Sequence, residues 1–189
     1  AVTITQGNLT VSTPAGSADW DTRKTVGTMS MAGGKFYYEQ EIASKTQGVY
    51  SGVIKDSPQA TSSSLGFAPT GYGYYSDQGK KYNNQTGTDY GDTFGAGDVI
   101  SIAFDGITGT LWFAKNGVWQ DSATKTEIAA GTTTNSAWTG IDTDMRPGFS
   151  GYETQESNFN FGQRAWKYPS SVPSGFKALC TQNLPDTFS

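Results

Sequence analysis

The chain has 189 residues, with 13 basic and 17 acidic side chains, no histidine and a single cysteine, Cys180. The lack of histidine excludes Ser-His-Asp and Cys-His nucleophiles and histidine-ligated metal sites. One cysteine excludes an intrachain disulfide and a thiolate zinc cluster. The net charge of −4, with scattered basic residues, gives no electrostatic basis for binding nucleic acid. We therefore expect no nucleic-acid partner, no metal and no cofactor.

Length and composition predict one all-β domain. A chain of this length is usually a single unit and buries a sufficient core without disulfides or metals. Its 24 Gly, 10 Tyr, 10 Phe and 5 Trp, with abundant Ser and Thr, are typical of short strands joined by frequent turns. No apolar run reaches the roughly 18 residues of a membrane-spanning helix, so we expect no membrane insertion. The first ten residues lack the basic and apolar regions of a signal peptide.

The N-terminal residues 1–32 predict short strands. Val2 and Ile4, then Leu9 and Val11, alternate with polar residues at the period of a strand. Trp20 follows a break in this pattern. We interpret it as a core residue or a lid on the sandwich, with a ligand platform as the alternative.

The segment GGKFYYEQEIAS, residues 33–44, predicts a strand on which Glu39 and Glu41 share a face. Residues two apart on a strand lie about 6.5–7 Å apart at the backbone, a spacing compatible with the paired carboxylates of a glycoside hydrolase. A solvated strand face carries glutamates just as readily, and we favour that interpretation.

Residues 50–54 predict the next strand, and the polar residues 55–66 predict an exposed loop of the kind that carries recognition. The segment GYGYYSDQGKKYNN, residues 71–84, predicts a hairpin that turns at 77–79. Its tyrosines, among them Tyr72 and Tyr74, either cap the core or present surfaces for sugar or protein contacts. The core interpretation is favoured.

Residues 94–119, FGAGDVISIAFDGITGTLWFAKNGVW, predict an antiparallel meander. Two apolar runs rich in β-branched and aromatic residues form strands, and Asn116-Gly117 forms a tight hairpin turn because both residues tolerate positive φ. Trp112 is expected in the core. Its neighbours Leu111 and Phe113 are also apolar, which indicates that both faces of this strand are covered.

Residues 121–140 are polar and predict another loop, in which Trp138 is either pinned to the body of the domain or free for contacts. The candidate ligand-contacting residues are aromatic or amide side chains of the predicted loops and hairpins: Tyr72, Tyr74, Asn84, Tyr90, Trp119 and Trp138. We expect residues 1–177 to form the sandwich and residues 178–189 to form an exit segment or linker.

Taken together, these motifs resemble the SPRY domain family. The matching pieces, in order, are GKFYYEQEI (34–42), GVI (52–54), GYGYYSDQGKKYNN (71–84), residues 90–119, RPGFS (146–150) and NFNFG (158–162). The resemblance implies an antiparallel two-sheet β-sandwich of the concanavalin A-like jelly-roll type. It also implies a non-catalytic binding module, in which Glu39 and residues 72–75 belong to the framework. Ligand surfaces of the family are loops at one end of the sandwich, here residues 55–66, 83–93 and 121–140.

The C-terminal segment GFKALCTQNLPD, residues 175–186, resembles segments that follow SPRY modules in bacteriophage virion and tail proteins. This resemblance implies a module on a virion surface that recognises a host-surface glycan or protein. The alternative is an interaction module that docks to other virion proteins. A glycoside hydrolase using Glu39 and Glu41 is the third hypothesis.

Overall fold

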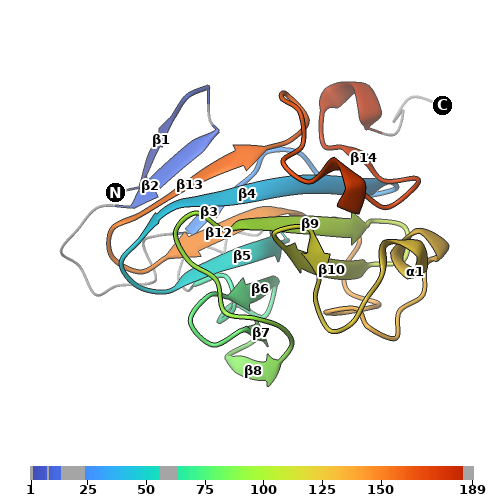
Figure 1. The fold of residues 1–189 in the computed structure, drawn as a ribbon, viewed down its shortest axis with the longest axis horizontal. Helices are drawn as coiled ribbons and strands as arrows, with labels where there is room; N and C mark the ends of the chain where they lie inside the picture. The colour runs from blue at the N-terminus through green and yellow to red at the C-terminus, as the bar shows by residue number, and fades with distance from the viewer. Residues whose placement is uncertain (1, 8, 14–23, 56–63, 185–189) are drawn as a thin grey trace.

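The computed structural model describes residues 2–7, 9–13, 24–55 and 64–184, which form two β-sheets packed face to face (Figure 1). All strand pairings among these residues are antiparallel except one, between a short C-terminal strand and sheet A. The prediction of an antiparallel two-sheet sandwich is therefore confirmed. Trp20 and residues 56–63 of the predicted loop lie outside the described residues.

Sheet A contains, in spatial order, β1 (Thr3–Thr5), β2 (Thr10–Thr13), β13 (Gln155–Asn160), β4 (Lys35–Lys45), β9 (Val99–Asp105), β10 (Thr110–Lys115) and β11 (Val118–Trp119). The short strand β14 (Lys177–Ala178) pairs with β4 in parallel. Sheet B contains β3 (Lys24–Val26), β12 (Arg146–Gly151), β5 (Val49–Ile54), β6 (Gly71–Tyr75), β7 (Lys80–Asn83) and β8 (Thr86–Asp89). One helix, α1 (Lys125–Ala130), and two 3₁₀ turns, Pro169–Ser171 and Thr181–Asn183, complete the described elements.

The main core lies between the two sheets, because alternate residues of each strand point toward the opposing sheet. The strands β4, β6, β9, β10 and β12 contribute many of its side chains, among them Phe36, Tyr38, Tyr74, Ile100, Ile102, Phe104, Leu111, Phe113 and Phe149. A second apolar cluster lies on the outer face of sheet A. It contains Tyr37, Trp112, Trp119, Ile128 and Phe176.

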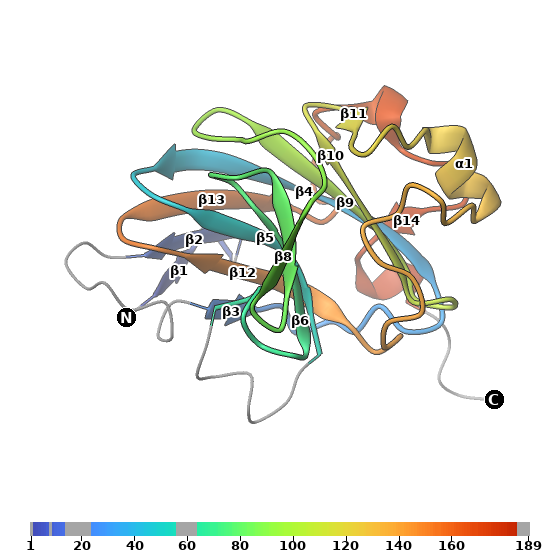
Figure 2. The same ribbon diagram turned by 90° about the horizontal axis from the view of Figure 1, so that it is seen from below.

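The outer face of sheet A is covered by α1 and by the chain that follows β13 (Figure 2). Leu111 and Phe113 belong to the main core, whereas Trp112 packs in the outer cluster, with its ring centroid 6.3 Å from that of Phe176. Strand β10 is therefore buried on both faces. The prediction that Trp112 is a core residue and that both faces of its strand are covered is confirmed.

The predicted tight turn after β10 is confirmed. Asn116 has φ 49° and Gly117 has φ 82°, and Lys115 pairs directly with Val118 across a two-residue loop. Positive φ at both positions is the signature of a type I′ hairpin turn. The Asn116 side chain also holds the start of β9: its Oδ1 accepts from the amide of Val99 at 2.9 Å.

Two predicted loops contain regular structure. Residues 83–93 include β8, which forms a second hairpin with β7 through Asn84 and Gln85, both at positive φ. Residues 121–140 include α1, which begins after the capping box formed by Thr124 and Glu127. The spacing T-x-x-E at 124–127 is the sequence signature of a helix N-terminus, but the polar character of the segment favoured a loop.

The C-terminal residues as far as 184 stay on the body of the domain. β14 pairs with β4, and Leu179 is buried in the main core. A domain boundary after residue 177 stays a prediction.

Candidate functional site

Four side chains of the second sheet and its flanking loops form a cluster at one end of the sandwich: Tyr72, Lys81, Tyr90 and Trp138. We call it the lysine–aromatic cluster. The Lys81 ammonium lies 5.3 Å from the ring centroid of Tyr90 and 5.7 Å from a ring centroid of Trp138. Its Nζ donates a hydrogen bond to the carbonyl oxygen of Ala137 at 2.7 Å. Both ring distances fall within the range of cation–π attraction.

Strand alternation brings Lys81 to this position. It pairs with Tyr74 of β6, while its neighbours Lys80 and Tyr82 point to the other face of sheet B. Burial lowers the pKa of Lys81 below its usual value, and the negative charge of Asp121 acts in the opposite direction. Among the described residues no carboxylate lies within ion-pair distance of Lys81. The cluster thus holds a partly desolvated positive charge between two aromatic rings.

Trp138 is pinned to the sandwich and half-buried at the same time. Its carbonyl accepts from the amide of Leu111 at 2.9 Å, which fixes the backbone of this segment to β10. Its ring makes an edge contact with Tyr72 at a centroid distance of 5.2 Å. Burial raises the pKa of Tyr72, and the charge of Asp142 adds to this shift. Trp138 is therefore pinned to the body of the domain, one of the two alternatives expected, and its ring is partly exposed. A contact role for this ring stays a prediction.

Three candidate residues lie outside this cluster. Tyr74 and Trp119 are buried, and the Trp119 Nε1 donates to the carbonyl of Ser171 at 3.0 Å. Asn84 is exposed at the tip of the β7–β8 hairpin. The structure thus brings Tyr72, Tyr90 and Trp138 together around Lys81. A role of any of them in ligand contact stays a prediction. Sequence reasoning missed Lys81, because KKYN has no apolar alternation that would turn this lysine inward.

Glu39 and Glu41 line a polar pocket of about 330 Å³ on the outer face of sheet A. Glu39 is only 3% exposed. Its carboxylate accepts hydrogen bonds from the amides of Lys167 and Tyr168 at 2.8 and 3.1 Å and from the Tyr37 hydroxyl at 3.1 Å. Glu41 is half-buried, 4.0 Å from Arg164. The geometry gives Glu39 a structural task, which is to anchor the chain that follows β13.

Two features that the described residues lack bear on other functions. No group of three or more His, Cys, Asp or Glu side chains in this part of the chain is arranged to hold a metal ion. No helix in this part is long and apolar enough to span a membrane.

A model of the SPRY domain family matches residues 35–164. The chain belongs to the SPRY domain family. The matched residues run from β4 through β13 and include the meander and the lysine–aromatic cluster. The resemblance seen in the sequence is confirmed at the level of the family. SPRY domains are protein-interaction modules, so the chain is a binding module by family.

Relatives and solved structures agree with this SPRY assignment. The chain is 30% identical over 146 residues to a Ran-binding proteins 9/10 homolog of Drosophila melanogaster. The aligned region covers 74% of this chain and 13% of the relative. It is 37% identical over 86 residues to Ran-binding protein 9 of Xenopus tropicalis, covering 44% of this chain and 16% of the relative. The chain thus spans about one sixth or less of the length of these curated relatives.

Two solved human SPRY domains share the fold. A crystal structure of a human SPRY domain superposes with a TM-score of 0.65 at 16% identity, over 87% of this chain and 97% of that one. The SPRY domain of human HERC1 gives a TM-score of 0.64 at 15% identity, over 87% and 94%. At this identity the likeness concerns the fold alone. None of the four proteins named here is a virion protein.

Proposed function

We propose that this SPRY domain recognises a protein partner through the surface around the lysine–aromatic cluster. The observation that carries the proposal is the half-buried ring of Trp138, held on a fixed backbone beside Tyr72 and the ammonium of Lys81. Tryptophan and tyrosine dominate the binding energy of protein interfaces. A side chain that is already immobilised loses little conformational entropy on binding.

The charge of Lys81 indicates what part of a partner this surface accepts. The ammonium has three donors, and one is taken by the carbonyl of Ala137. A carboxylate or main-chain carbonyl of a bound peptide is a fitting acceptor for the rest. The aromatic rings beside it accept an apolar side chain. We therefore expect a partner segment that combines an acceptor group with an apolar residue.

Two substitutions on neighbouring residues of β7 test this proposal. Lys81→Met keeps the apolar stem against the rings but removes the charge, whereas Lys80→Met removes a charge from the opposite face, where Lys80 lies 3.7 Å from Asp89. Peptides selected from a displayed random library against the wild-type chain should bind Lys81→Met at least about tenfold more weakly, a difference of about 1.4 kcal/mol. Lys80→Met should bind them within about twofold.

Two outcomes overturn the proposal. One is a set of selected peptides that binds both variants like the wild type. The other is wild-type protein that selects no peptide but binds a purified surface polysaccharide. Thermal unfolding of each variant establishes that a loss of binding is not a loss of fold.

We also retain the proposal that the chain is a virion module, exposed outside the cell, that binds a host-surface glycan or protein. It is supported only by the resemblance of residues 175–186 to segments of phage virion proteins. The curated relatives named above come from animals. Docking to another virion subunit is the corresponding alternative, for which β8 provides an edge strand with exposed Thr86 and Thr88.

The glycoside hydrolase hypothesis has less support than these. Glu39 is enclosed, and its oxygens are engaged by the amides of Lys167 and Tyr168. A general acid or nucleophile must reach the glycosidic oxygen or the anomeric carbon of a sugar.

A further inference from the structure

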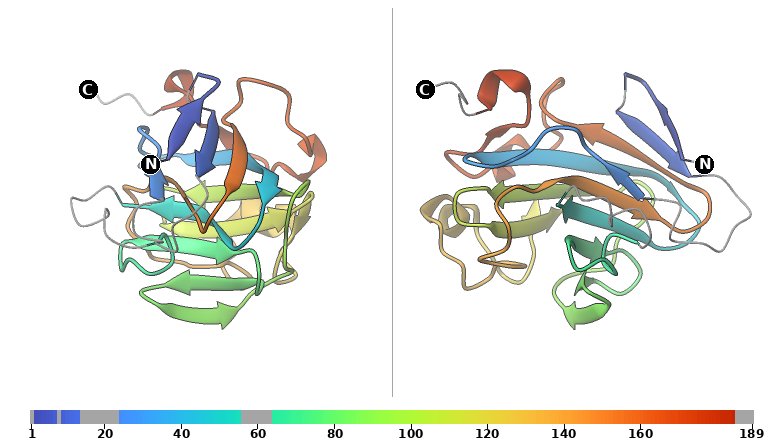
Figure 3. Two further views of the ribbon diagram at one scale, coloured as in Figure 1. Left: turned by 90° about the vertical axis from the view of Figure 1, so that its left-hand side faces the viewer. Right: turned by 180° about the vertical axis from the view of Figure 1, so that it is seen from behind.

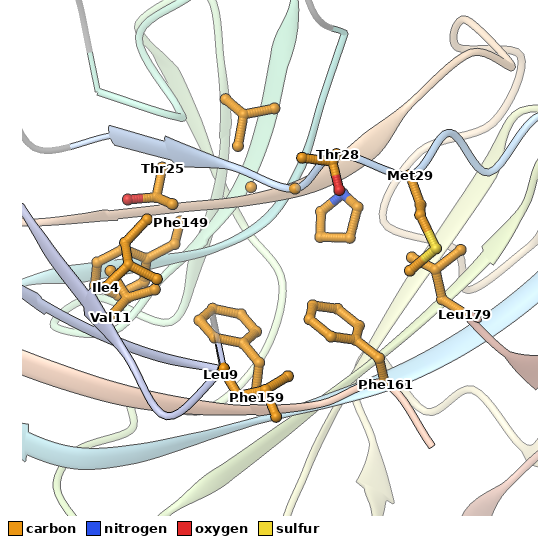
Figure 4. A pocket seen from close by; sticks show the side chains of 15 residues that line it. Ile4, Leu9, Val11, Thr25, Thr28, Met29, Phe149, Phe159, Phe161 and Leu179 are labelled. Carbon is orange, nitrogen blue, oxygen red and sulfur yellow. The ribbon is translucent and has the colours of Figure 1, made fainter. Parts of the chain in front are cut away.

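Among the residues that the structure describes, the sandwich is open along the side where the edge strands β1 and β3 lie. There a cavity of about 420 Å³ opens between the two sheets (Figure 4). It lies away from the lysine–aromatic cluster: the β1–β2 hairpin, in dark blue, and the β7–β8 hairpin, in green, lie on opposite sides of the molecule (Figure 3). The cavity shares no lining residue with the cluster.

Both sheets supply the walls of this cavity. Sheet A contributes Leu9, Val11, Phe159 and Phe161 from β2, β13 and the residues beside them, and sheet B contributes Val26, Pro147 and Phe149. The floor is buried, since Val11, Phe149 and Leu179 belong to the main core. The rim is open, and Ile4 of β1 is 46% exposed.

The aromatic walls are held in place by packing. The rings of Phe149 and Phe159 meet edge to face at a centroid distance of 6.2 Å, and Phe159 lies parallel to Phe161 at 5.7 Å. The ring of Phe161 also packs against that of Tyr38 of β4, with a centroid distance of 5.4 Å. Such fixed rings make a preformed wall, whereas the flexible thioether of Met29 on the opposite side adapts to different shapes.

The chemistry of the lining selects for a neutral molecule. Among the 15 described residues that line the cavity none is charged, and Thr25 and Thr28 carry its only side-chain hydroxyls. A charged or strongly polar occupant would give up its hydrogen bonds to water on entering the cavity, and the lining offers too few to replace them. The free energy of binding would therefore be unfavourable.

The volume sets the size of the occupant. Ligand pockets of proteins measure roughly 300–1,000 Å³, and a cavity of about 150 Å³ holds a benzene molecule. The present cavity of about 420 Å³ therefore matches a bicyclic or tricyclic hydrocarbon or a short alkyl chain. We propose that the open side of the sandwich binds a neutral small molecule made largely of hydrocarbon, independently of the protein partner proposed above.

A fluorescence titration with the neutral probe N-phenyl-1-naphthylamine tests this proposal, because emission of the probe rises in an apolar environment. The wild-type chain should bind it saturably, and binding should raise the melting temperature by mass action. Thr28→Trp places a bulky ring at the cavity and should weaken binding at least about tenfold. The matched control is Thr88→Trp, the same change at an exposed threonine of β8 on the opposite edge. It should leave binding unchanged within about twofold.

A second variant keeps the proposal testable if Thr28→Trp folds poorly. Met29→Gln introduces a polar amide of similar length into the cavity and should weaken binding about fivefold or more, since a buried polar group without a hydrogen-bond partner is costly. The proposal is overturned if the wild-type chain shows no saturable binding. It is equally overturned if folded Thr28→Trp and Met29→Gln both bind the probe like the wild type.

Discussion

At the scale of single residues, the same type of side chain has opposite surroundings two positions apart. Glu39 is enclosed by the chain that follows β13 and takes hydrogen bonds from two backbone amides 128 and 129 residues away. Glu41, on the same strand, is half-buried at the rim of the pocket. Backbone amides are obligatory donors, so a buried carboxylate that satisfies two of them fixes a loop that has little regular structure of its own.

We predict that Glu39→Ala lowers the free energy of unfolding by about 3 kcal/mol, because it leaves buried donors without a charged acceptor. Glu41→Ala, the matched control, should change it by less than about 0.5 kcal/mol. Urea titrations of the two variants and the wild type measure both values. Equal losses for the two variants would contradict the anchoring role of Glu39.

At the scale of elements, β10 shows why the meander is central to the fold. It pairs with β9 over six positions and contributes side chains to the core on one face and to the outer cluster on the other. Its burial on both faces accounts for a nearly continuous apolar sequence where a half-exposed strand would alternate.

Trp112 offers the sharpest test of this arrangement. Trp112→Ala should lower the free energy of unfolding by about 3–5 kcal/mol, because it removes an almost fully buried tryptophan from the outer cluster and leaves a cavity under α1 and Phe176. Val118→Ala in the neighbouring strand β11, where Val118 is 67% exposed, should cost less than about 0.5 kcal/mol. Chemical denaturation measures both. A small loss for Trp112→Ala would mean that the outer cluster contributes little to stability.

At the scale of the whole molecule, the fold buries many of its tyrosine side chains. Burial raises the pKa of Tyr37, Tyr38, Tyr50, Tyr74 and Tyr90 above the usual range of tyrosine. Burial likewise raises the pKa of Tyr75 to about 12, and the nearby Asp77 adds to this shift. The folded chain therefore retains protons that the unfolded chain releases near pH ~10.

We predict that these tyrosines leave stability unaffected below about pH 9 and lower it as the pH rises through 10 and above. The direction of this effect follows from the raised pKa values. The stability that these tyrosines contribute is fully present below the pKa that they have in the unfolded chain. It is lost as the pH rises from there toward the pKa that they have in the folded chain. Burial moves the pKa of Lys81 downward, which opposes the trend, but the tyrosines outnumber it. Urea unfolding at several pH values, with tyrosinate absorbance recorded in parallel, measures the effect. Constant stability up to pH ~12 would contradict the prediction.

The sequence by itself determined the family, the sandwich and the meander with its Asn116-Gly117 turn. The meander and its turn depend on period-two alternation and on local φ preferences, which neighbouring residues decide. The family, and with it the sandwich, followed from the resemblance of motifs that match in order along the chain. Only the tertiary structure decided what covers each face: the C-terminal segment and α1 over Trp112, and the loop around Trp138 over Lys81. Alternation divides a strand into two faces but does not say which distant segment packs on either, because such contacts join residues far apart in the chain.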